Sequence, residues 1–297
     1  MKLYLPLVVA AAALTFGCSP MESEDEKRVA ENDKLIQSYI TANSVSPTKT
    51  TSGLYYQMKN SNPTGRKPEV GEQISVTMVI RNLSGTVIND YYQINPFKLV
   101  YHTGGTSFTS LLEGASYMRE GENIMMLAPY YLAYGSGDLK DSTGRLLLPG
   151  YSPVRVDMTL VKTRNEEEQI RQYLIDNKLT LTDSTSDGLR YIRKTAGTGA
   201  AVTNGKTVKL KYTGRLITGG KFDESTDGSF SVTMGVANII TGFSKGLLMM
   251  KQGEKATIIF PSSLGYGTQG VANQNGYGYY IMPYSPLVFD IEVVSVE

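Results

Sequence analysis

Alternating apolar and polar residues predict antiparallel strands in the last third of the chain. In "TVKLKYTGRL", residues 207–216, the side chains of Val208, Leu210 and Tyr212 fall on one face of an extended strand. The segments "ATIIFP" and "LVFDIEVVSV" are rich in apolar and β-branched residues, which are typical of strands in a sheet. We therefore expect a sheet with one covered face.

A helical pattern lies between these strands. In "GFSKGLLMMKQG", Phe243, Leu247 and Met250 recur at the spacing of one helix face, and we expect Gly253 to end the helix. Together the patterns predict an α+β fold, in which a curved antiparallel sheet wraps on one short helix against its concave face.

One further helix is predicted at the start of each half of the chain. Ser23 with Glu26, and Asn165 with Glu168, have the spacing of a capping box. Each helix has an apolar side that should pack on its sheet. These apolar residues are Val29, Ile36, Tyr39 and Ile40 in the first helix, and Ile170, Tyr173 and Leu174 in the second.

The two halves also resemble each other in sequence. "MREGENIMMLAPYYLAYGSG" from residue 118 is similar to "MKQGEKATIIFPSSLGYGTQ" from residue 250, with four residue pairs at one constant separation. Such a duplication indicates two similar domains. The pairs are Gly121/Gly253, Glu122/Glu254, Pro129/Pro261 and Tyr134/Tyr266. We expect a signal peptide at 1–17, a tether and helix at 18–49, a first copy at 50–164, a linker helix at 165–185 and a second copy at 186–297.

Composition excludes several classes of function. The chain is 41% hydrophobic and 19% charged with a formal net charge of +1, so no basic field points to a nucleic-acid partner. His102 is the only histidine, which argues against a histidine-based triad and a histidine-rich metal site. We expect His102 to be an exposed turn residue, and we expect no cofactor.

The N-terminus, "MKLYLPLVVAAAALTFGCSP", has the pattern of a signal peptide: one lysine, then an apolar run too short to span a bilayer. Cys18, the only cysteine, lies where cleavage would fall. This resembles a bacterial lipoprotein signal, in which the cysteine becomes the lipidated N-terminus. The alternative is an ordinary secretory signal with an incidental cysteine. The acidic "MESEDE" that follows is a solvated tether or, alternatively, a surface-export address.

The second copy resembles the FKBP-type peptidyl-prolyl cis-trans isomerases over nearly its whole length. The motifs that carry the resemblance occur in the family's order: "VKLKYTGRL", "GGKFDES", "FSVTMG", "NIITGFSKGLLMMKQGEK", "FPSSLGYG" and "PLVFDIEVV". The resemblance implies catalytic roles for four residues and a substrate-binding role for six. The four are Tyr212, Phe222, Asp223 and Tyr266. The six are Phe230, Ile239, Ile240, Phe243, Ile281 and Phe289.

The resemblance also implies what these residues do. The hydroxyl of Tyr212 would steady Asp223, the backbone amide near Ile240 would contact a ligand carbonyl, and Tyr266 would donate to the bound carbonyl. Phe243 would be the pocket floor. The loop after Tyr266, "GTQGVANQNGYGYYIMPYSP", is longer than in minimal family members, and we expect it to be mobile.

The first copy is expected to keep the scaffold and lose part of the pocket. Tyr134 stands for Tyr266, and Phe97 for Phe230. Five positions of the pocket change, which predicts weak or no activity. We place Ile80 at the position of Tyr212, Ile88 at that of Phe222, Asn89 at that of Asp223, Leu111 at that of Phe243 and Val156 at that of Phe289, with the hairpin loop two residues shorter.

Two functions remain open at this point. The first is a lipid-anchored prolyl isomerase that assists the folding of proline-containing polypeptides in the cell envelope, on the periplasmic face or the cell surface. The second is a lipoprotein that binds proline segments, or acts as a chaperone, without turnover. A homodimer is compatible with both.

Overall fold

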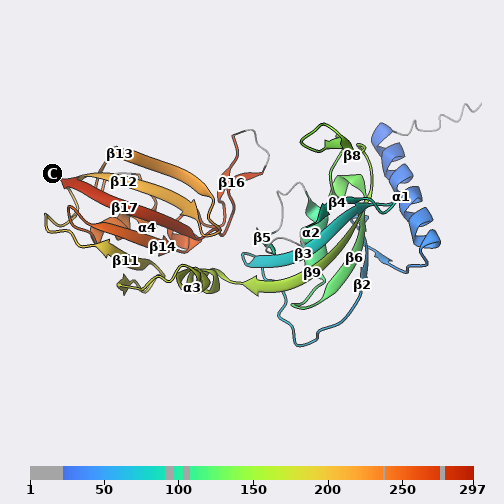
Figure 1. The fold of residues 1–297 in the computed structure, drawn as a ribbon, viewed down its shortest axis with the longest axis horizontal. Coiled ribbons are helices and arrows are strands. Elements are labelled where there is room, and N and C mark those ends of the chain that lie inside the picture. Colours follow the sequence, from blue (N-terminus) through green and yellow to red (C-terminus); the bar gives the residue numbers. More distant parts are fainter. Residues whose placement is uncertain (1–22, 91–95, 103–107, 237, 275–277) are drawn as a thin grey trace, which may run out of the picture.

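The computed structural model describes residues 23–90, 96–102, 108–236, 238–274 and 278–297. Figure 1 shows two curved sheets side by side, joined by a strand that continues into a short helix. Cys18 and the predicted signal peptide lie outside the described residues. Within the described ranges, no helix is long and apolar enough to cross a membrane.

The first half contains two α-helices, one short 3-10 helix and nine strands among the described residues. They are α1 (Glu24–Ala42), β1 (Thr48–Lys49), β2 (Tyr55–Met58), β3 (Gln73–Asn82), β4 (Val87–Asp90), β5 (Phe97–Val100), α2 (Thr109–Ser116), β6 (Asn123–Ala128), η1 (Tyr130–Leu132), β7 (Leu139–Lys140), β8 (Leu146–Leu148) and β9 (Val154–Arg164).

The second half repeats this order from α3 onward. Its elements are α3 (Glu166–Asp176), β10 (Asp183–Ser184), β11 (Arg190–Thr195), β12 (Thr207–Leu216), β13 (Lys221–Thr233), α4 (Thr241–Leu248), β14 (Lys255–Phe260), η2 (Ser262–Leu264), β15 (Val271–Ala272), β16 (Tyr279–Ile281) and β17 (Leu287–Val296).

The two sheets have the same antiparallel topology. The first sheet has the order β1-β2-β6-β9-β3-β4, with β5 also paired to β3, and the second has the order β10-β11-β14-β17-β12-β13. The long β13 therefore corresponds to β4 and β5 together. The predicted α+β fold, with a short helix on each antiparallel sheet, is confirmed.

Two glycines bring α4 close to the sheet. A Cβ atom on Gly242 would lie 2.5 Å from the ring of Phe260, and one on Gly246 would lie 2.5 Å from Cδ1 of Ile258. A larger residue at Gly242 would have to displace the ring of Phe260, and one at Gly246 would have to displace the side chain of Ile258. This close approach sets the depth at which Phe243, between the two glycines, enters the concave face.

The end of α4 differs from the prediction. The helix ends at Leu248, with Met249 as its C-cap, so the prediction that Gly253 ends it is wrong. Gly253 instead has φ +81° and donates its N–H to the carbonyl of Val293 at 2.8 Å. Its conformation serves the turn into β14, where a left-handed φ favours glycine.

Both predicted capping boxes are present. The Oγ atom of Ser23 accepts from the N–H of Glu26 at 3.2 Å, and the Glu26 carboxylate accepts from the N–H of Ser23 at 2.7 Å. Asn165 and Glu168 exchange the same bonds at 2.9 and 2.8 Å. The predicted packing side of the first helix is correct at Ile36, which is fully buried, but wrong at Val29, which is 40% exposed.

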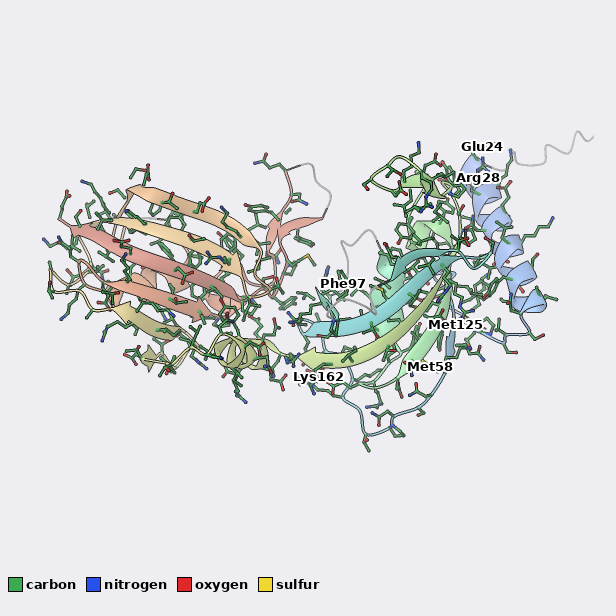
Figure 2. The ribbon with its side chains drawn as sticks, viewed as in Figure 1. Glu24, Arg28, Met58, Phe97, Met125 and Lys162 are labelled. Carbon is green, nitrogen blue, oxygen red and sulfur yellow. The ribbon has the colours of Figure 1, made fainter. Side chains whose placement is uncertain are left out.

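Figure 2 shows the side chains on the same view, with Glu24 and Arg28 on α1 at the edge of the first sheet that faces away from the second half. Phe97 and Lys162 lie at the edge that faces it. Met125 of β6 packs with Ile36 and Tyr55 in a cluster beneath α1. The helix is therefore held by the convex face of the first sheet.

Packing of α1 can be tested with two neighbouring residues. Ile36→Ala should lower the free energy of unfolding by about 2–5 kcal/mol, because it leaves a cavity beneath α1. Leu35 is 52% exposed, so Leu35→Ala should change it by less than about 0.5 kcal/mol. Urea unfolding measures both, and equal losses would contradict this docking of α1.

Candidate active site

A cavity of about 410 Å³ opens on the second copy between α4, the β12–β13 hairpin and the segment after η2. Its lining is mostly aromatic and aliphatic, with one carboxylate. The lining residues are Tyr212, Asp223, Phe230, Asn238, Ile239, Ile240, Phe243, Tyr266 and Phe289. The structure thus brings together eight of the ten residues selected from the sequence and adds Asn238.

The other two selected residues lie behind this lining. Phe222 is 9% exposed and Ile281 is 1% exposed, and both belong to the hydrophobic core of the second copy. The ring of Phe222 meets the ring of Phe289 edge-on at 5.5 Å. Phe222 therefore supports a wall of the cavity from behind.

One hydrogen bond joins the two strands of the hairpin at the cavity. The hydroxyl of Tyr212 donates to Oδ2 of Asp223 at 2.7 Å. Phe222 is an extra residue in the ladder, since Gly214 pairs with Asp223 and Arg215 pairs with Lys221. Such a bulge re-aims side chains. Here it allows the ring of Phe222 to enter the core while the next side chain, Asp223, lines the cavity.

The aromatic rings hold one another in place. Tyr212 meets Phe230 at 5.1 Å and Phe243 at 5.4 Å between ring centroids, and Phe243 meets Phe289 at 5.0 Å, all with steeply inclined planes. Edge-to-face pairs are the favoured geometry of aromatic contacts. Gly214 leaves room for this packing, because a Cβ atom there would lie 2.8 Å from the Phe289 ring.

The start of α4 forms the rim of the cavity. Ile240 is the N-cap residue, and its side chain supplies no capping hydrogen bond. The first backbone N–H groups of a helix have no partner inside the helix. Because Ile239 and Ile240 line the cavity, these N–H groups begin at its edge.

Tyr266 follows η2 and closes the opposite side. Burial raises the pKa of its phenol, with smaller contributions from Asp223 and Tyr280. Burial also raises the pKa of Tyr212, and the hydrogen bond to Asp223 adds to this. Both phenols are therefore neutral hydrogen-bond donors at physiological pH.

The loop after Tyr266 has secondary structure of its own. Strands β15 and β16 pair antiparallel, with Val271 opposite Ile281, and the hydroxyl of Tyr280 donates to the backbone carbonyl of Phe222. We call residues 265–274 and 278–286 the flap. The first copy has an equivalent hairpin, β7 with β8. The expected mobility of this loop stays a prediction.

The register of the first copy corrects one assignment. Ile80 corresponds to Gly214, so the prediction that it stands at the position of Tyr212 is wrong. Met78, two residues earlier, takes that position. The sequence alone misplaced it because the alternating pattern is satisfied equally by a shift of two residues. The equivalent strand pairs are Ile80–Val156 with Gly214–Phe289, and Met78–Met158 with Tyr212–Ile291.

The hairpin of the first copy is therefore as long as that of the second, and the prediction of a loop two residues shorter is wrong. Ile80 pairs with Asn89 as Gly214 pairs with Asp223, and Ile88 is the bulged residue. This register supports the assignments of Ile88 and Asn89.

In the first copy, Tyr134 at the position of Tyr266 has side-chain partners of its own. The side-chain amide of Asn89 donates to the hydroxyl of Tyr134 at 2.9 Å, and the ring of Phe108 meets that of Tyr134 at 5.1 Å. Leu111 on α2 is buried, and Phe97 lies opposite Val76 as Phe230 lies opposite Leu210. The tyrosine that faces an open cavity in the second copy is thus bonded to its neighbours in the first.

His102 is not an exposed turn residue as predicted. It is 6% exposed, and its ring meets that of Tyr279 edge-on at 5.9 Å. Burial lowers its pKa. The sequence could not show this burial, because the covering ring comes from the other half of the chain.

Residues 199–294 match the family model of FKBP-type peptidyl-prolyl cis-trans isomerases. A probable FKBP-type peptidyl-prolyl cis-trans isomerase of Haemophilus influenzae is 32% identical over 146 residues, which are 49% of this chain and 57% of that protein. An FK506-binding protein of Neisseria meningitidis is 36% identical over 102 residues, 34% of this chain and 88% of that protein. The crystal structure of FkpA from Escherichia coli is 33% identical, covering 45% of this chain and 59% of that one, with a TM-score of 0.38.

The chain belongs to the family of FKBP-type peptidyl-prolyl cis-trans isomerases. The matched segment is the one that carries the cavity. The chain spans 57% of the Haemophilus protein's length, so the likeness concerns this segment and not the whole of that protein.

The bond between Tyr212 and Asp223 can be tested by titration. Asp223→Asn should lower the pKa of Tyr212, because the carboxylate disfavours a phenolate beside it. Glu224→Gln is the control, since the Glu224 carboxylate pairs with Lys221 instead. NMR of ¹³Cζ-labelled tyrosine follows the titration, and an unchanged pKa of Tyr212 in Asp223→Asn would rule out the bond in solution.

Proposed function

We propose that the second copy catalyses cis-trans isomerisation of X-Pro bonds. The observation that carries the proposal is the open aromatic cavity with the hydrogen bond from Tyr212 to Asp223 at its wall. Membership of the isomerase family agrees with it. The phenols of Tyr212 and Tyr266 and the carboxylate of Asp223 are the polar groups among the lining side chains that bear on a bound amide.

The barrier to this reaction comes from resonance in the peptide bond. Partial double-bond character of C–N gives a barrier of about 18–20 kcal/mol, and uncatalysed exchange takes tens to hundreds of seconds. Water favours the charge-separated resonance form of the amide. A cavity walled by Phe230, Phe243 and Phe289 excludes water around the proline ring, which lowers the cost of twisting the bond.

Each group has a role in the twisted state. The aromatic walls hold the proline ring, and the phenol of Tyr266 donates a hydrogen bond to the carbonyl once it has rotated. A backbone amide beside Ile240 contacts a second ligand carbonyl. Asp223 is fixed by Tyr212 at the wall. Interactions that strengthen only in the twisted state raise the rate without tightening substrate binding.

The alternative is a module that binds proline segments, or a chaperone, without turnover. In the first copy Asn89 bonds to Tyr134 and the Tyr212–Asp223 pair is replaced, which argues against turnover in the first copy alone. We infer that the first copy, residues 50–164, has weak or no isomerase activity and that residues 165–185 link it to the second copy, residues 186–297.

We further propose that the protein is a lipoprotein of the cell envelope, anchored through Cys18 and acting on proline-containing polypeptides. The N-terminal sequence supports the anchor. A homodimer stays a prediction from the sequence.

Isomerase activity is tested with the full chain and a short X-Pro peptide. Wild type should accelerate exchange, and Tyr266→Phe should lower kcat/KM about tenfold, equivalent to a loss of ~1.4 kcal/mol of transition-state stabilisation. Tyr134→Phe is the matched control, because it removes the same hydroxyl from the first copy and should leave the rate unchanged. Absence of acceleration by wild type would favour the binding module.

The anchor has a separate test. Metabolic labelling with a fatty acid should mark the wild-type chain and should be lost in Cys18→Ala. Label that persists in Cys18→Ala would show that the cysteine is not the acylation site.

A further inference from the structure

The flap of the second copy rests on the first copy as well as on its own sheet. Figure 1 shows β16 at the edge of the second copy that faces the first copy. Two described contacts cross between the copies here, one through Tyr284 and one through Tyr279. Both tyrosines belong to the flap that carries Tyr266.

The first contact is a close fit between a ring and a glycine. A Cβ atom on Gly71 would lie 2.7 Å from Cδ1 and 3.1 Å from Cε1 of Tyr284. The ring of Tyr284 therefore lies close against the backbone of the first copy at Gly71. Gly71 has φ +93°, a conformation that glycine adopts without strain.

The second contact is adjacent to the first. His102 is buried against Tyr279 in an edge-to-face pair with an interplanar angle of 89°. Gly71 donates its N–H to the carbonyl of Tyr101 at 2.8 Å, and Tyr101 precedes His102. Gly71 and His102 thus form one patch on the first copy, which we call the flap seat.

Each of the two contacts is linked through one hydrogen bond to a residue next to the cavity. The N–H of Tyr284 donates to the carbonyl of Gly267 at 3.0 Å, and Gly267 follows Tyr266. Tyr280, next to Tyr279, donates its hydroxyl to the carbonyl of Phe222, which precedes Asp223. A displacement of the flap from its seat would therefore move Tyr266 relative to Asp223.

The first copy holds its own flap with a different element. Tyr151 is the counterpart of Tyr284, with φ 57° against 58° and the same bond from its N–H, here to Gly135 at 3.1 Å. Its ring lies under the guanidinium of Arg28 at 5.0 Å, and its carbonyl accepts from Asn32 at 2.8 Å. Both partners are on α1.

The linker helix is too short to do the same for the second copy. Asn32 on α1 accepts from the N–H of Tyr130 at 3.0 Å, and Glu166 on α3 accepts from the N–H of Ser262 at 2.5 Å. Glu166 is the first residue of α3, whereas α1 begins eight residues before Asn32. The helical turn that carries Arg28 has no counterpart in α3. In the second copy, the flap seat contacts the ring of Tyr284 where Arg28 contacts the ring of Tyr151 in the first copy.

The linker helix is itself fixed to the first copy. Arg66 pairs with Glu168 at 2.7 Å and also with Glu72, and the side chain of Gln73 donates to that of Gln169 at 3.3 Å. These contacts hold the start of α3 beside the start of β3, two residues after Gly71. The position of the second copy against Gly71 is therefore set by side chains and not by the flap alone.

We propose that the flap seat of the first copy positions Tyr266 for the isomerase reaction of the second copy. This inference rests on the proposed function and assigns Gly71 and Tyr284 as positioning residues. Since the seat lies at the end of the first sheet that faces the second copy (Figure 2), the first copy can provide it without a pocket of its own.

The test compares two glycines of the first copy in the full chain. Gly71→Ala and Gly85→Ala introduce the same strain, at φ +93° and +96°, but a Cβ atom on Gly85 meets nothing within 4 Å. Gly71→Ala should lower kcat/KM for an X-Pro peptide about fivefold. Gly85→Ala should leave kcat/KM unchanged although it also lowers the unfolding temperature, because it introduces the backbone strain without the contact to Tyr284. Equal kcat/KM in the two variants would overturn the proposal.

A double-mutant cycle separates positioning from general damage. In a Tyr266→Phe background, Gly71→Ala should have little further effect on kcat/KM, because the hydroxyl that it displaces is already absent. Full additivity would overturn the proposal. If Gly71→Ala does not fold, Tyr284→Leu with Tyr151→Leu as its control replaces it, since both residues have the same φ.

A readout without turnover keeps this inference distinct from the isomerase proposal. In chain labelled with 3-fluorotyrosine, the resonance of Tyr266, identified by its loss in Tyr266→Phe, should shift in Gly71→Ala and stay in place in Gly85→Ala. If the Tyr266 resonance shifts in Gly71→Ala but the wild-type chain does not catalyse isomerisation, the isomerase proposal fails while the contact between the flap and its seat is supported. An unmoved resonance would sink the seat, whatever the activity.

Discussion

The close approach of α4 to β14 is the constraint on which the cavity depends. Gly242 and Gly246 allow the helix to lie against Phe260 and Ile258, and this depth brings Phe243 into contact with the other rings. A larger residue at either glycine would push against Phe260 or Ile258, and Phe243 would then lose part of its contact with Tyr212 and Phe289. The cavity is thus a product of backbone contact more than of the aromatic residues themselves.

The two copies share one fold but differ in the residues of the pocket. They share strand order, the bulge at Ile88 and Phe222, and the turn after the short helix, but they differ at both partners of the Tyr212–Asp223 bond, which are Met78 and Asn89 in the first copy. With Asn89, the side-chain amide donates to the hydroxyl of Tyr134. With Asp223, the carboxylate can only accept, so it draws the hydroxyl of Tyr212 and leaves the flap tyrosine facing the cavity.

Local patterns predicted the strands, the capping boxes and the rings around the cavity, because alternation and helical spacing report directly on buried faces. They failed where the answer depends on a partner far away in the chain. Val29 has helical spacing but is 40% exposed, whereas Ile36 on the same side of the helix is fully buried, and His102 is covered by Tyr279 of the other copy. Ile80 was misplaced because a two-residue shift preserves alternation.

The order of the two copies along the chain has a consequence for biosynthesis. Chains emerge from the ribosome N-terminus first, and domains generally fold as units in that order. The last strand of the first sheet ends at Arg164, long before Tyr279 and Tyr284 are made. The surface around Gly71 is therefore complete when the flap emerges, and the flap assembles on a finished template. Exchange of the two copies in a permuted chain would reverse this sequence and leave the flap to form without its support.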